Sequence, residues 1–316
     1  MPTPIRYTQA SDTTSDTLAL RNAAIIVCLP IEQVENTVNE NHVDGKVIIV
    51  TGAASGFGRL VCQKTASLGA RIVACDINET GLNETASSIN AEGGEAIAVL
   101  ADVTSRKEML VVADQAINVF SKINVMVNNA GIMPLAFYSD HEDAAEAWDQ
   151  CIDINIKGVL NGITAVHDQM LKQGSGHIVN ISSIYGNYPI AGAAVYGATK
   201  AAVIFLSESL RMESQGRIKV TTIRPTGVPA TGLGAGIINP EAVNGLLGAN
   251  TAAYMSKFEA AQAGQLPNRM LDKNEIEYFA LDPDSLSDQI VYTINQPWGV
   301  AISDITIRAS GDAYIL

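Results

Sequence analysis

"KVIIVTGAASGFGRL", residues 46–60, decides the fold of this chain. Its first half is a run of Val and Ile that predicts a buried β-strand, and its second half begins a helical stretch. Between the two halves stand Gly52, Gly56 and Gly58, spaced G-x-x-x-G-x-G. Glycines at a strand-to-helix junction permit a tight turn and let backbone N–H groups approach a pyrophosphate at the helix N-terminus. The stretch therefore predicts the first unit of a nucleotide-binding α/β sheet.

The same strand-then-helix rhythm continues along the rest of the sequence. Apolar strands are expected at 46–52, 70–76, 95–103, 123–131, 176–183, 219–225 and 302–307. Helices are expected from the glycine loop to about residue 68 and at 79–92, 105–120, 143–173, 193–216 and 285–296. Nearly continuous apolar strands that alternate with helices are typical of a parallel sheet covered on both faces. The fold class is therefore α/β, a single-domain, doubly wound parallel sheet (Rossmann fold) of about seven strands.

Two segments fall outside this rhythm. Residues 1–43 precede the first strand and are interpreted as an N-terminal extension; their apolar run at 23–30 lacks the basic flank of a signal peptide. Residues 44–316 form the α/β domain, and within it 227–282 shows no strand pattern. A long excursion after the sixth strand lies on the ligand side of a parallel sheet, so we expect it to be a substrate lid.

Composition excludes several classes of function. The chain has 316 residues and a net charge of -13, which argues against nucleic acid because phosphate binding needs clustered Lys and Arg. No run of 18 apolar residues occurs, so a membrane span is not expected. The four cysteines form no CxxC pair, so neither a metal site nor a disulfide framework is expected. A reducing, cytoplasmic location is the expectation.

Carboxylates at strand ends indicate which dinucleotide is bound. Asp76 ends the second expected strand, where a carboxylate can accept both ribose hydroxyls of NAD and would repel a 2′-phosphate. No cation stands at Ser55 or Ile77, so NAD is favoured over NADP, although Asp76 could also simply cap a turn. Asp102 and Val103, after the third strand, are placed to flank the adenine.

A set of motifs then resembles a known family. They are "TGAASGFG" (51–58), "NNAG" (128–131), Asn155 in "DINIKG", Ser183 in "NISS" and "YGATK" (196–200). In this order and spacing they resemble the short-chain dehydrogenase/reductase family, over residues 44 to about 310. The resemblance implies an NAD-dependent alcohol dehydrogenase or carbonyl reductase.

The proposed chemistry centres on Tyr196 and Lys200. Residues four apart share one helix face, and a nearby cation lowers the pKa of a phenol, so we expect Tyr196 to act as general acid and base. The hydroxyl of Ser183 can hold the substrate oxygen. The resemblance assigns Ser183 this role, lets Lys200 hold the nicotinamide ribose, and lets Asn155 position a water that leads to Lys200.

The resemblance also implies a cofactor site that spans several strand ends. Its expected members are Gly52, Ser55, Gly56, Phe57, Gly58, Asp76, Ile77, Asp102, Val103, Asn129, Ala130, Gly131, Tyr196, Lys200, Pro225, Gly227, Val228 and Thr231. The family usually has Pro-Gly after the sixth strand, whereas here Thr226 follows the proline. The substrate pocket is expected to include Met133, Ile184, Tyr185 and Tyr188, which suit a moderately hydrophobic secondary alcohol or ketone.

Alternatives remain for the function and the assembly. The tail at 296–308 resembles the branch that acts on hydroxy acids and hydroxy amino acids, so an NADP-dependent enzyme of that kind is one alternative. A non-catalytic NAD-binding or sensing protein is another, while the glycine spacing disfavours a sugar-nucleotide epimerase. Family analogy implies a homotetramer or homodimer through the helices at 143–173 and 193–216, and residues 313–316 are candidates to dock on a neighbour.

Overall fold

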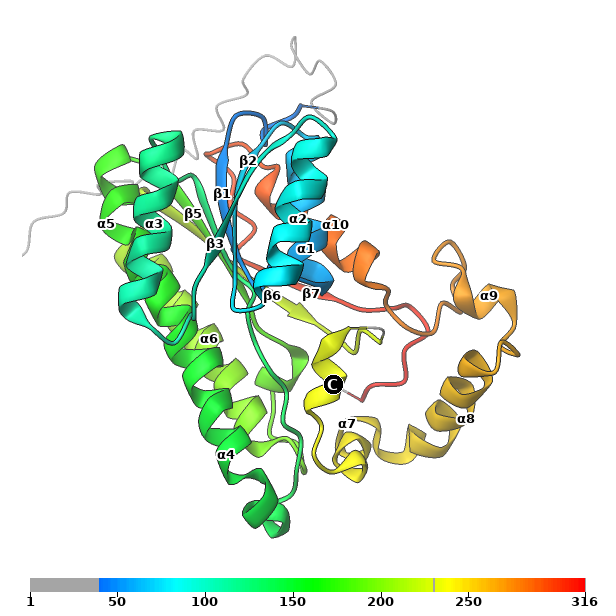
Figure 1. The fold of residues 1–316 in the computed structure, drawn as a ribbon. Coiled ribbons are helices and arrows are strands. Elements are labelled where there is room, and N and C mark those ends of the chain that lie inside the picture. Colours follow the sequence, from blue (N-terminus) through cyan, green and yellow to red (C-terminus); the bar gives the residue numbers. More distant parts are fainter. Residues whose placement is uncertain (1–39, 230, 316) are drawn as a thin grey trace, which may run out of the picture. The chain divides into compact units, whose positions relative to one another are not determined.

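Seven parallel strands in the order β3-β2-β1-β4-β5-β6-β7 form the centre of the structure (Figure 1). The computed structural model describes residues 40–229 and 231–315, so the predictions made for residues 1–39 lie outside the described residues. The strands are β1 (Val47–Thr51), β2 (Arg71–Asp76), β3 (Glu95–Leu100), β4 (Val125–Asn128), β5 (Gly176–Ile181), β6 (Ile218–Pro225) and β7 (Asp304–Ile307). Sequence patterning predicted each of them, and the parallel α/β class is confirmed.

Helices cover both faces of the sheet (Figure 1). The helices next to the strands are α1 (Gly56–Ser67), α2 (Glu79–Ala91), α3 (Arg106–Phe120), α4 (His141–Ile152), α5 (Val159–Gln173), α6 (Ala194–Glu213) and α10 (Pro283–Ile294). The stretch predicted as helical at 143–173 is divided by a π-helical turn, Asp153–Gly158, which separates α4 from α5. No helix of the described residues is long and apolar enough to cross a membrane.

The side-chain alternation of the strands divides the core into two layers. In β1, Ile48 and Val50 pack with residues of α1, α2 and α10, whereas Val47 and Ile49 pack with residues of α3, α5 and α6. Successive residues of a strand point to opposite faces, so a strand covered on both sides must be apolar throughout. This requirement explains why residues 47–50 contain only Val and Ile.

The strand order reverses at β1, and this reversal positions the functional site. The chain builds β2 and β3 on one side of β1 and then crosses to place β4 on the other side. The connections that leave the carboxyl ends of β1 and β4 therefore diverge, and a crevice opens between them.

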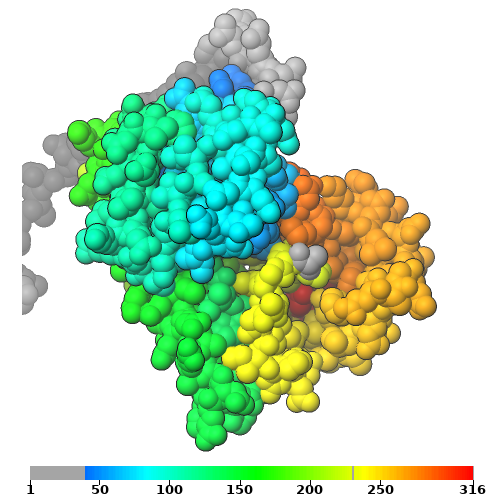
Figure 2. Space-filling view, in the orientation of Figure 1, coloured from blue at the N-terminus to red at the C-terminus, as the bar shows by residue number. Residues whose placement is uncertain are grey.

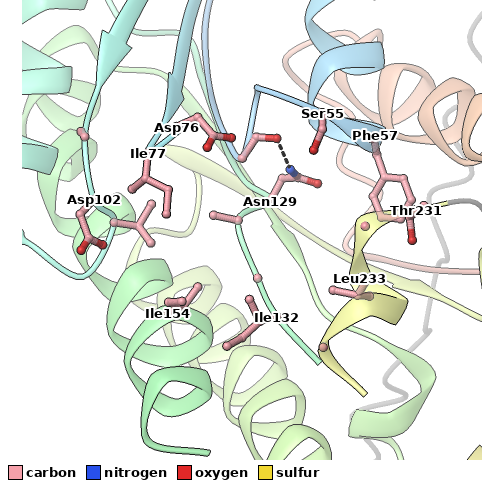
Figure 3. Close-up of a pocket in the computed structure, with 18 residues that line it drawn as sticks. Ser55, Phe57, Asp76, Ile77, Asp102, Asn129, Ile132, Ile154, Thr231 and Leu233 are labelled. Carbon is pink, nitrogen blue, oxygen red and sulfur yellow. Dashed lines mark hydrogen bonds between the residues drawn. The ribbon is translucent and has the colours of Figure 1, made fainter. Parts of the chain in front are cut away.

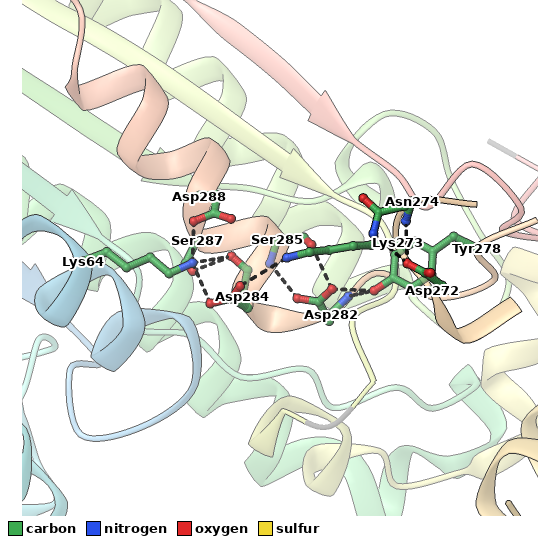
Figure 4. Close-up of polar contacts among 10 residues, drawn as sticks. All are labelled: Lys64, Asp272, Lys273, Asn274, Tyr278, Asp282, Asp284, Ser285, Ser287 and Asp288. Carbon is green, nitrogen blue, oxygen red and sulfur yellow. Dashed lines mark hydrogen bonds and ion pairs between the residues drawn. The ribbon is translucent and has the colours of Figure 1, made fainter. Parts of the chain in front are cut away.

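The excursion that begins after β6 contains no strand among its described residues and passes through α7 (Asn244–Leu247), α8 (Thr251–Gln262) and α9 (Asn268–Leu271). Figure 4 shows how it is attached where it returns to the sheet. Lys64 of α1 forms ion pairs with Asp284 and Asp288 of α10, at 2.7 and 2.5 Å. The hydroxyl of Tyr278 donates to Asp282, whose carboxylate also accepts from the N–H of Ser285 and so caps α10.

Helix α10 offers a test of this packing. Ile290 is fully buried against the sheet, so Ile290→Ala should lower the free energy of unfolding by about 2–4 kcal/mol through a lost contact and a cavity. Tyr292→Ala, on the exposed face of the same helix, should change it by less than about 0.5 kcal/mol. Urea denaturation measures both values, and equal losses in the two variants would contradict the assigned face.

Candidate active site

The glycine loop after β1 depends on glycine for two separate reasons. Gly52 and Gly56 have φ angles of 68° and 52°, in the left-handed region that side chains disfavour. A Cβ on Gly58 would lie 2.1 Å from the carbonyl oxygen of Gly52, so α1 could not begin so close to the strand. A Cβ on Gly56, in contrast, would meet no atom within 4 Å, because this residue faces an open cavity.

A small polar clamp joins this loop to the end of β4. The side-chain amide of Asn129 donates to the carbonyl oxygens of Thr51 and Gly52, at 2.8 and 3.3 Å. In return, the hydroxyl oxygen of Thr51 accepts from the N–H groups of Asn129 and Ala130, at 3.0 and 3.1 Å. The two loops that border the crevice are thus held at a fixed separation.

A first cavity of about 350 Å³ lies along this crevice. Figure 3 shows Asp76, Ile77 and Asp102 at one end of it and Phe57 and Thr231 toward the other. Its lining consists of Gly52, Ser55, Gly56, Phe57, Asp76, Ile77, Ala101, Asp102, Val103, Asn129, Ala130, Gly131, Ile132, Ile154, Thr231, Gly232, Leu233 and Gly236. The described lining contains two carboxylates and no Lys or Arg.

Asp76 is held in place by its backbone neighbours. Its two carboxylate oxygens accept from the N–H of Ala54 and the N–H of Asn78, both at 2.9 Å. A carboxylate oxygen has more than one acceptor site, so each remains able to accept a further hydroxyl. The turn-capping role that the sequence left open and a ligand-binding role are therefore compatible.

A second cavity of about 300 Å³ adjoins the first, and five residues line both. Among the residues around it are the polar side chains of Ser183, Tyr196 and Lys200. The shared residues are Phe57, Asn129, Gly131, Thr231 and Leu233. A ligand that occupies the first cavity can therefore extend into the second without leaving the protein.

Burial controls the charge of Tyr196 and Lys200. The pKa of Tyr196 is raised above its usual range by burial, which a hydrogen bond with Ser183 opposes only in part. Burial lowers the pKa of Lys200 to about 8. The Lys200 ammonium lies 5.7 Å from the centre of the Tyr196 ring and donates to the carbonyl oxygen of Ile181 at 2.9 Å. Desolvation of the phenolate therefore dominates the pKa of Tyr196 in this structure, and the expectation that Lys200 lowers this pKa stays a prediction.

The two neighbouring serines have different surroundings. The hydroxyl of Ser182 donates to the carbonyl oxygen of Lys200 at 2.8 Å and so ties β5 to α6. Ser183 lines the second cavity, and its hydroxyl oxygen accepts from the N–H of Tyr185 at 3.2 Å. The turn after Ser183 packs closely on α6: a Cβ on Gly197 would lie 2.9 Å from the carbonyl oxygen of Tyr185. Small residues in α6 therefore allow Ser183 and Tyr196 to meet.

Asn155 is fully buried and lies behind the cavities rather than in their lining. Its side chain accepts from the N–H of Ile132 and donates to the carbonyl oxygen of Ile132 and the hydroxyl of Thr199, each at 3.0 Å. A Cβ on Gly131 would lie 3.1 Å from Asn155 Oδ1 and 3.5 Å from Lys200 Nζ. Asn155 thus fixes the loop after β4 against α6, beside the ammonium of Lys200.

The predicted pocket residues divide into two groups. Met133 and Tyr185 line the second cavity, as do Pro225, Gly227 and Val228 of the loop after β6. Ile184 instead points into the core, because a short 3-10 turn begins directly after Ser183. Tyr188 is largely exposed and lines a separate groove beside α6.

The excursion was expected to cover the substrate, and its residues Leu233, Leu246, Tyr254 and Phe258 line the cavities, although the sequence did not single them out. Lining residues that were missed outside the excursion include Ile132, Ile154 and Tyr314. Ile132 adjoins the NNAG motif and was within reach of the sequence analysis. The aromatic residues carry no local signal, because their position depends on how distant segments return to the sheet.

A protein-family model matches more than half of this sequence. The model, described as short chain dehydrogenase, matches residues 46–241. The chain belongs to the short-chain dehydrogenase family. A relative that is 35% identical over 84% of this chain and 96% of its own length is an uncharacterised oxidoreductase of Listeria monocytogenes.

Two further similar proteins have more specific descriptions. A 2,5-dichloro-2,5-cyclohexadiene-1,4-diol dehydrogenase of Sphingobium indicum is 36% identical over 60% of this chain and 75% of its own length. A short-chain dehydrogenase/reductase of Burkholderia phymatum, solved in complex with NAD, is 29% identical. It covers 84% of this chain and 89% of its own, with a TM-score of 0.66. Other solved structures of the same fold contain NADP or 5-hydroxy-NADP. This short-chain dehydrogenase is thus an oxidoreductase whose structural neighbours bind NAD or NADP.

The residues of this family member fit a dinucleotide. The open space at Gly56 would accept a phosphate, and Asp76 would accept ribose hydroxyls at the other end of the first cavity. In the second cavity, the hydroxyl of Thr226 is buried and has no hydrogen-bond partner among the described residues. A buried polar atom without a partner is costly, which is consistent with a partner supplied by a bound ligand.

Gly58 tests the importance of the tight turn. Gly58→Ala would place a methyl group against the Gly52 carbonyl, so NADH affinity should fall by about 10-fold or more as the loop moves. The same overpacking should lower the free energy of unfolding by roughly 1–3 kcal/mol. Gly299→Ala is the matched control, because a Cβ there meets nothing within 4 Å. Fluorescence titration with NADH is the measurement, and unchanged affinity in Gly58→Ala would exclude a rigid phosphate-binding turn.

Proposed function

We propose that this short-chain dehydrogenase catalyses reversible hydride transfer between NAD(H) and a secondary alcohol or ketone. The observation that carries the proposal is the junction of the two cavities. A crevice with a glycine turn and Asp76 opens directly into a pocket lined by Ser183, Tyr196 and Lys200. NAD supplies the hydride chemistry when bound, and the protein supplies orientation, proton transfer and exclusion of water.

In the direction of ketone reduction, Tyr196 is the proton donor. Burial keeps its phenol neutral at ordinary pH, so it can protonate the substrate oxygen as negative charge develops there. The hydroxyl of Ser183 would hold the same oxygen, because it lines the second cavity together with Tyr196. In the direction of oxidation, Tyr196 accepts the hydroxyl proton.

Lys200 and Asn155 would complete the proton path. Lys200 Nζ and Asn155 Oδ1 both lie close to Gly131, and Lys200 lines the second cavity. We propose that Lys200 holds the nicotinamide ribose and that Asn155 positions a water beside it. The packing of Asn155 against Ile132 and Thr199 supports a rigid arrangement of these groups.

NAD is favoured over NADP by charge. Asp76 and Asp102 are the charged side chains of the described lining of the first cavity, and a 2′-phosphate would face this negative end unpaired. The nearby Arg59 donates to the carbonyl oxygens of Ala54 and Gly81 and forms an ion pair with Glu84 at 3.0 Å. Its Nη2 is therefore engaged in holding α2 against the glycine loop, whereas its Nε is buried without a hydrogen-bond partner among the described residues.

The second cavity suits a small and mostly uncharged substrate. Lys200 is the one cation in its described lining, so no arginine is placed to clamp a carboxylate. Arg269, an alternative clamp in the excursion, instead pairs with Glu277 at 2.9 Å. This lining disfavours the hydroxy acid and hydroxy amino acid alternatives. The Sphingobium relative acts on a cyclic diol, which supports the inclusion of ring alcohols among the substrates to be tested.

We also propose that copies of the chain associate through α5 and α6. Both helices expose large apolar side chains, with Leu160, Phe205 and Met212 accessible over 43%, 76% and 63% of their surface. A subunit contact is one way to cover large apolar side chains that two neighbouring helices leave exposed. A homodimer or homotetramer would cover these residues.

Tyr196 provides the test of catalysis. Removal of the phenol as proton donor should reduce turnover by about 100-fold or more in Tyr196→Phe, while NADH binding stays within about threefold of wild type. Absorbance at 340 nm with a panel of secondary alcohols, ketones and both cofactors measures turnover. Tyr292→Phe, the same change on the exposed face of α10, should be fully active. Turnover by Tyr196→Phe at the wild-type rate would refute the mechanism, and inactive wild type across the panel would favour a non-catalytic NAD-binding protein.

Asp76 provides the test of cofactor preference. Asp76→Asn keeps the shape of the side chain but removes its charge, so the ratio of kcat/KM with NAD to that with NADP should fall by about 10-fold or more. Asp114→Asn, an exposed carboxylate of α3, is the matched control and should leave the ratio unchanged. A wild-type preference for NADP, or an unchanged ratio in Asp76→Asn, would be incompatible with the proposed role.

A further inference from the structure

Two tyrosines place a pair of hydroxyl groups in the second cavity, away from the catalytic helix. Tyr254 of α8 and Tyr314 of the C-terminal segment both line this cavity together with Ser183 and Tyr196. Their hydroxyl oxygens lie 3.2 Å apart, and their ring centres are separated by 5.7 Å. The pair forms one hydrogen bond that joins the excursion to the end of the chain.

The C-terminal segment is firmly attached where Tyr314 enters the cavity. Arg308 donates to the carbonyl oxygen of Tyr314 at 2.8 Å, and Asn250 donates to the carbonyl oxygen of Ala313 at 2.8 Å. The N–H of Ile315 donates to the carbonyl oxygen of Leu246 at 3.1 Å. Residues 313–315 thus dock on the excursion of their own chain, whereas the sequence suggested a neighbouring chain. Figure 2 shows red C-terminal surface enclosed between the yellow and orange parts of the excursion.

The Tyr314 hydroxyl reaches the loop that follows β6. A Cβ on Gly227 would lie 1.7 Å from that oxygen, so the phenol occupies the space that any other residue would need. Gly227 follows Thr226, which lines the same cavity. The hydroxyl pair therefore lies inside the pocket and not at its outer rim.

The pair has hydrogen-bonding capacity that the protein does not use. Each phenol carries one donor and two acceptor sites, and their mutual bond uses one donor and one acceptor. Neither hydroxyl has another partner among the described residues. Val243, Leu246 and Phe258 make the neighbouring lining apolar, and burial raises the pKa of Tyr314, so its phenol stays neutral.

We propose that the Tyr254–Tyr314 pair binds a second oxygen of the substrate, so that the preferred substrates carry a hydroxyl or carbonyl group distant from the reacting carbon. This inference rests on the proposed function, because it takes Ser183 and Tyr196 to hold the reacting oxygen. A neutral oxygen fits, since the pair offers an O–H donor and acceptors but no charge to balance a carboxylate. The cavity volume limits the substrate to roughly one ring or a short chain.

Binding to the 316-residue chain loaded with NAD tests the proposal. The probes are two matched pairs, cyclohexanone with cyclohexane-1,4-dione and hexan-2-one with hexane-2,5-dione. None of them is a secondary alcohol, so none is oxidised during the measurement. We expect the dione of at least one pair to bind roughly 3- to 10-fold more tightly, after correction for its two equivalent carbonyls. Ligand-observed NMR titration gives the dissociation constants.

Variants assign the preference to the pair. Tyr254→Phe and Tyr314→Phe should each reduce the preference for the dione toward unity and leave affinity for the monoketone within about twofold. Tyr292→Phe should keep the wild-type preference. The absence of a preference in wild type, including the absence of dione binding, overturns the proposal. A preference that survives in both Phe variants overturns it as well.

Turnover separates this inference from the proposed function. Oxidation of cyclohexanol or reduction of cyclohexanone tests hydride transfer without any second oxygen. Turnover without a preference for the dione would reject the tyrosine pair and retain the dehydrogenase. A preference for the dione that depends on Tyr254 and Tyr314, without turnover of any panel compound, would retain the binding site and reject the dehydrogenase.

Discussion

The site depends above all on the hydrogen bonds by which Asn129 and Thr51 join the ends of β1 and β4. These strands are adjacent and parallel, but their connections leave in opposite directions, so a crevice opens between them. The amide of Asn129 fixes the carbonyls of the glycine turn, and the loop that continues from Asn129 reaches Gly131 beside Lys200. One clamp thus sets the distance between the first cavity and the helix of Tyr196.

Burial determines the chemical state of the groups beyond this clamp. It favours the neutral phenol of Tyr196 and lowers the pKa of Lys200 to about 8, so both shifts disfavour charge in the second cavity. A neutral phenol is ready to donate a proton to a developing alkoxide, which is the requirement of ketone reduction. Oxidation needs the phenolate, and its formation must overcome the same desolvation. Under the proposed mechanism, the neutral phenol therefore suits the reductive direction more directly than the oxidative one.

Local sequence patterns predicted the fold and the parts of the candidate site that lie in short motifs, but they could not predict contacts between distant segments. The strand of residues 47–50 and the glycines at 52, 56 and 58 encode their turn within a dozen residues, so the sequence revealed both. Ile184 was predicted to line the pocket because it follows Ser183 in the sequence. The 3-10 turn after Ser183 instead directs its side chain into the core. Tyr254 and Tyr314 lie 60 residues apart and meet only through tertiary packing. Sequence periodicity carries no information about such a contact.

Sheet topology explains why the end of the chain contributes to the site. Strand β7 pairs in parallel with β6, and its last residue, Ile307, lies opposite Pro225. Whatever follows β7 must therefore emerge beside Thr226 and Gly227, which line the second cavity. The segment from Arg308 needs only a few residues, at about 3.3 Å each, to cross the pocket and meet the excursion. The missing side chain at Gly227 leaves room for Tyr314, so the loop after β6 and the segment after β7 together line one part of the second cavity.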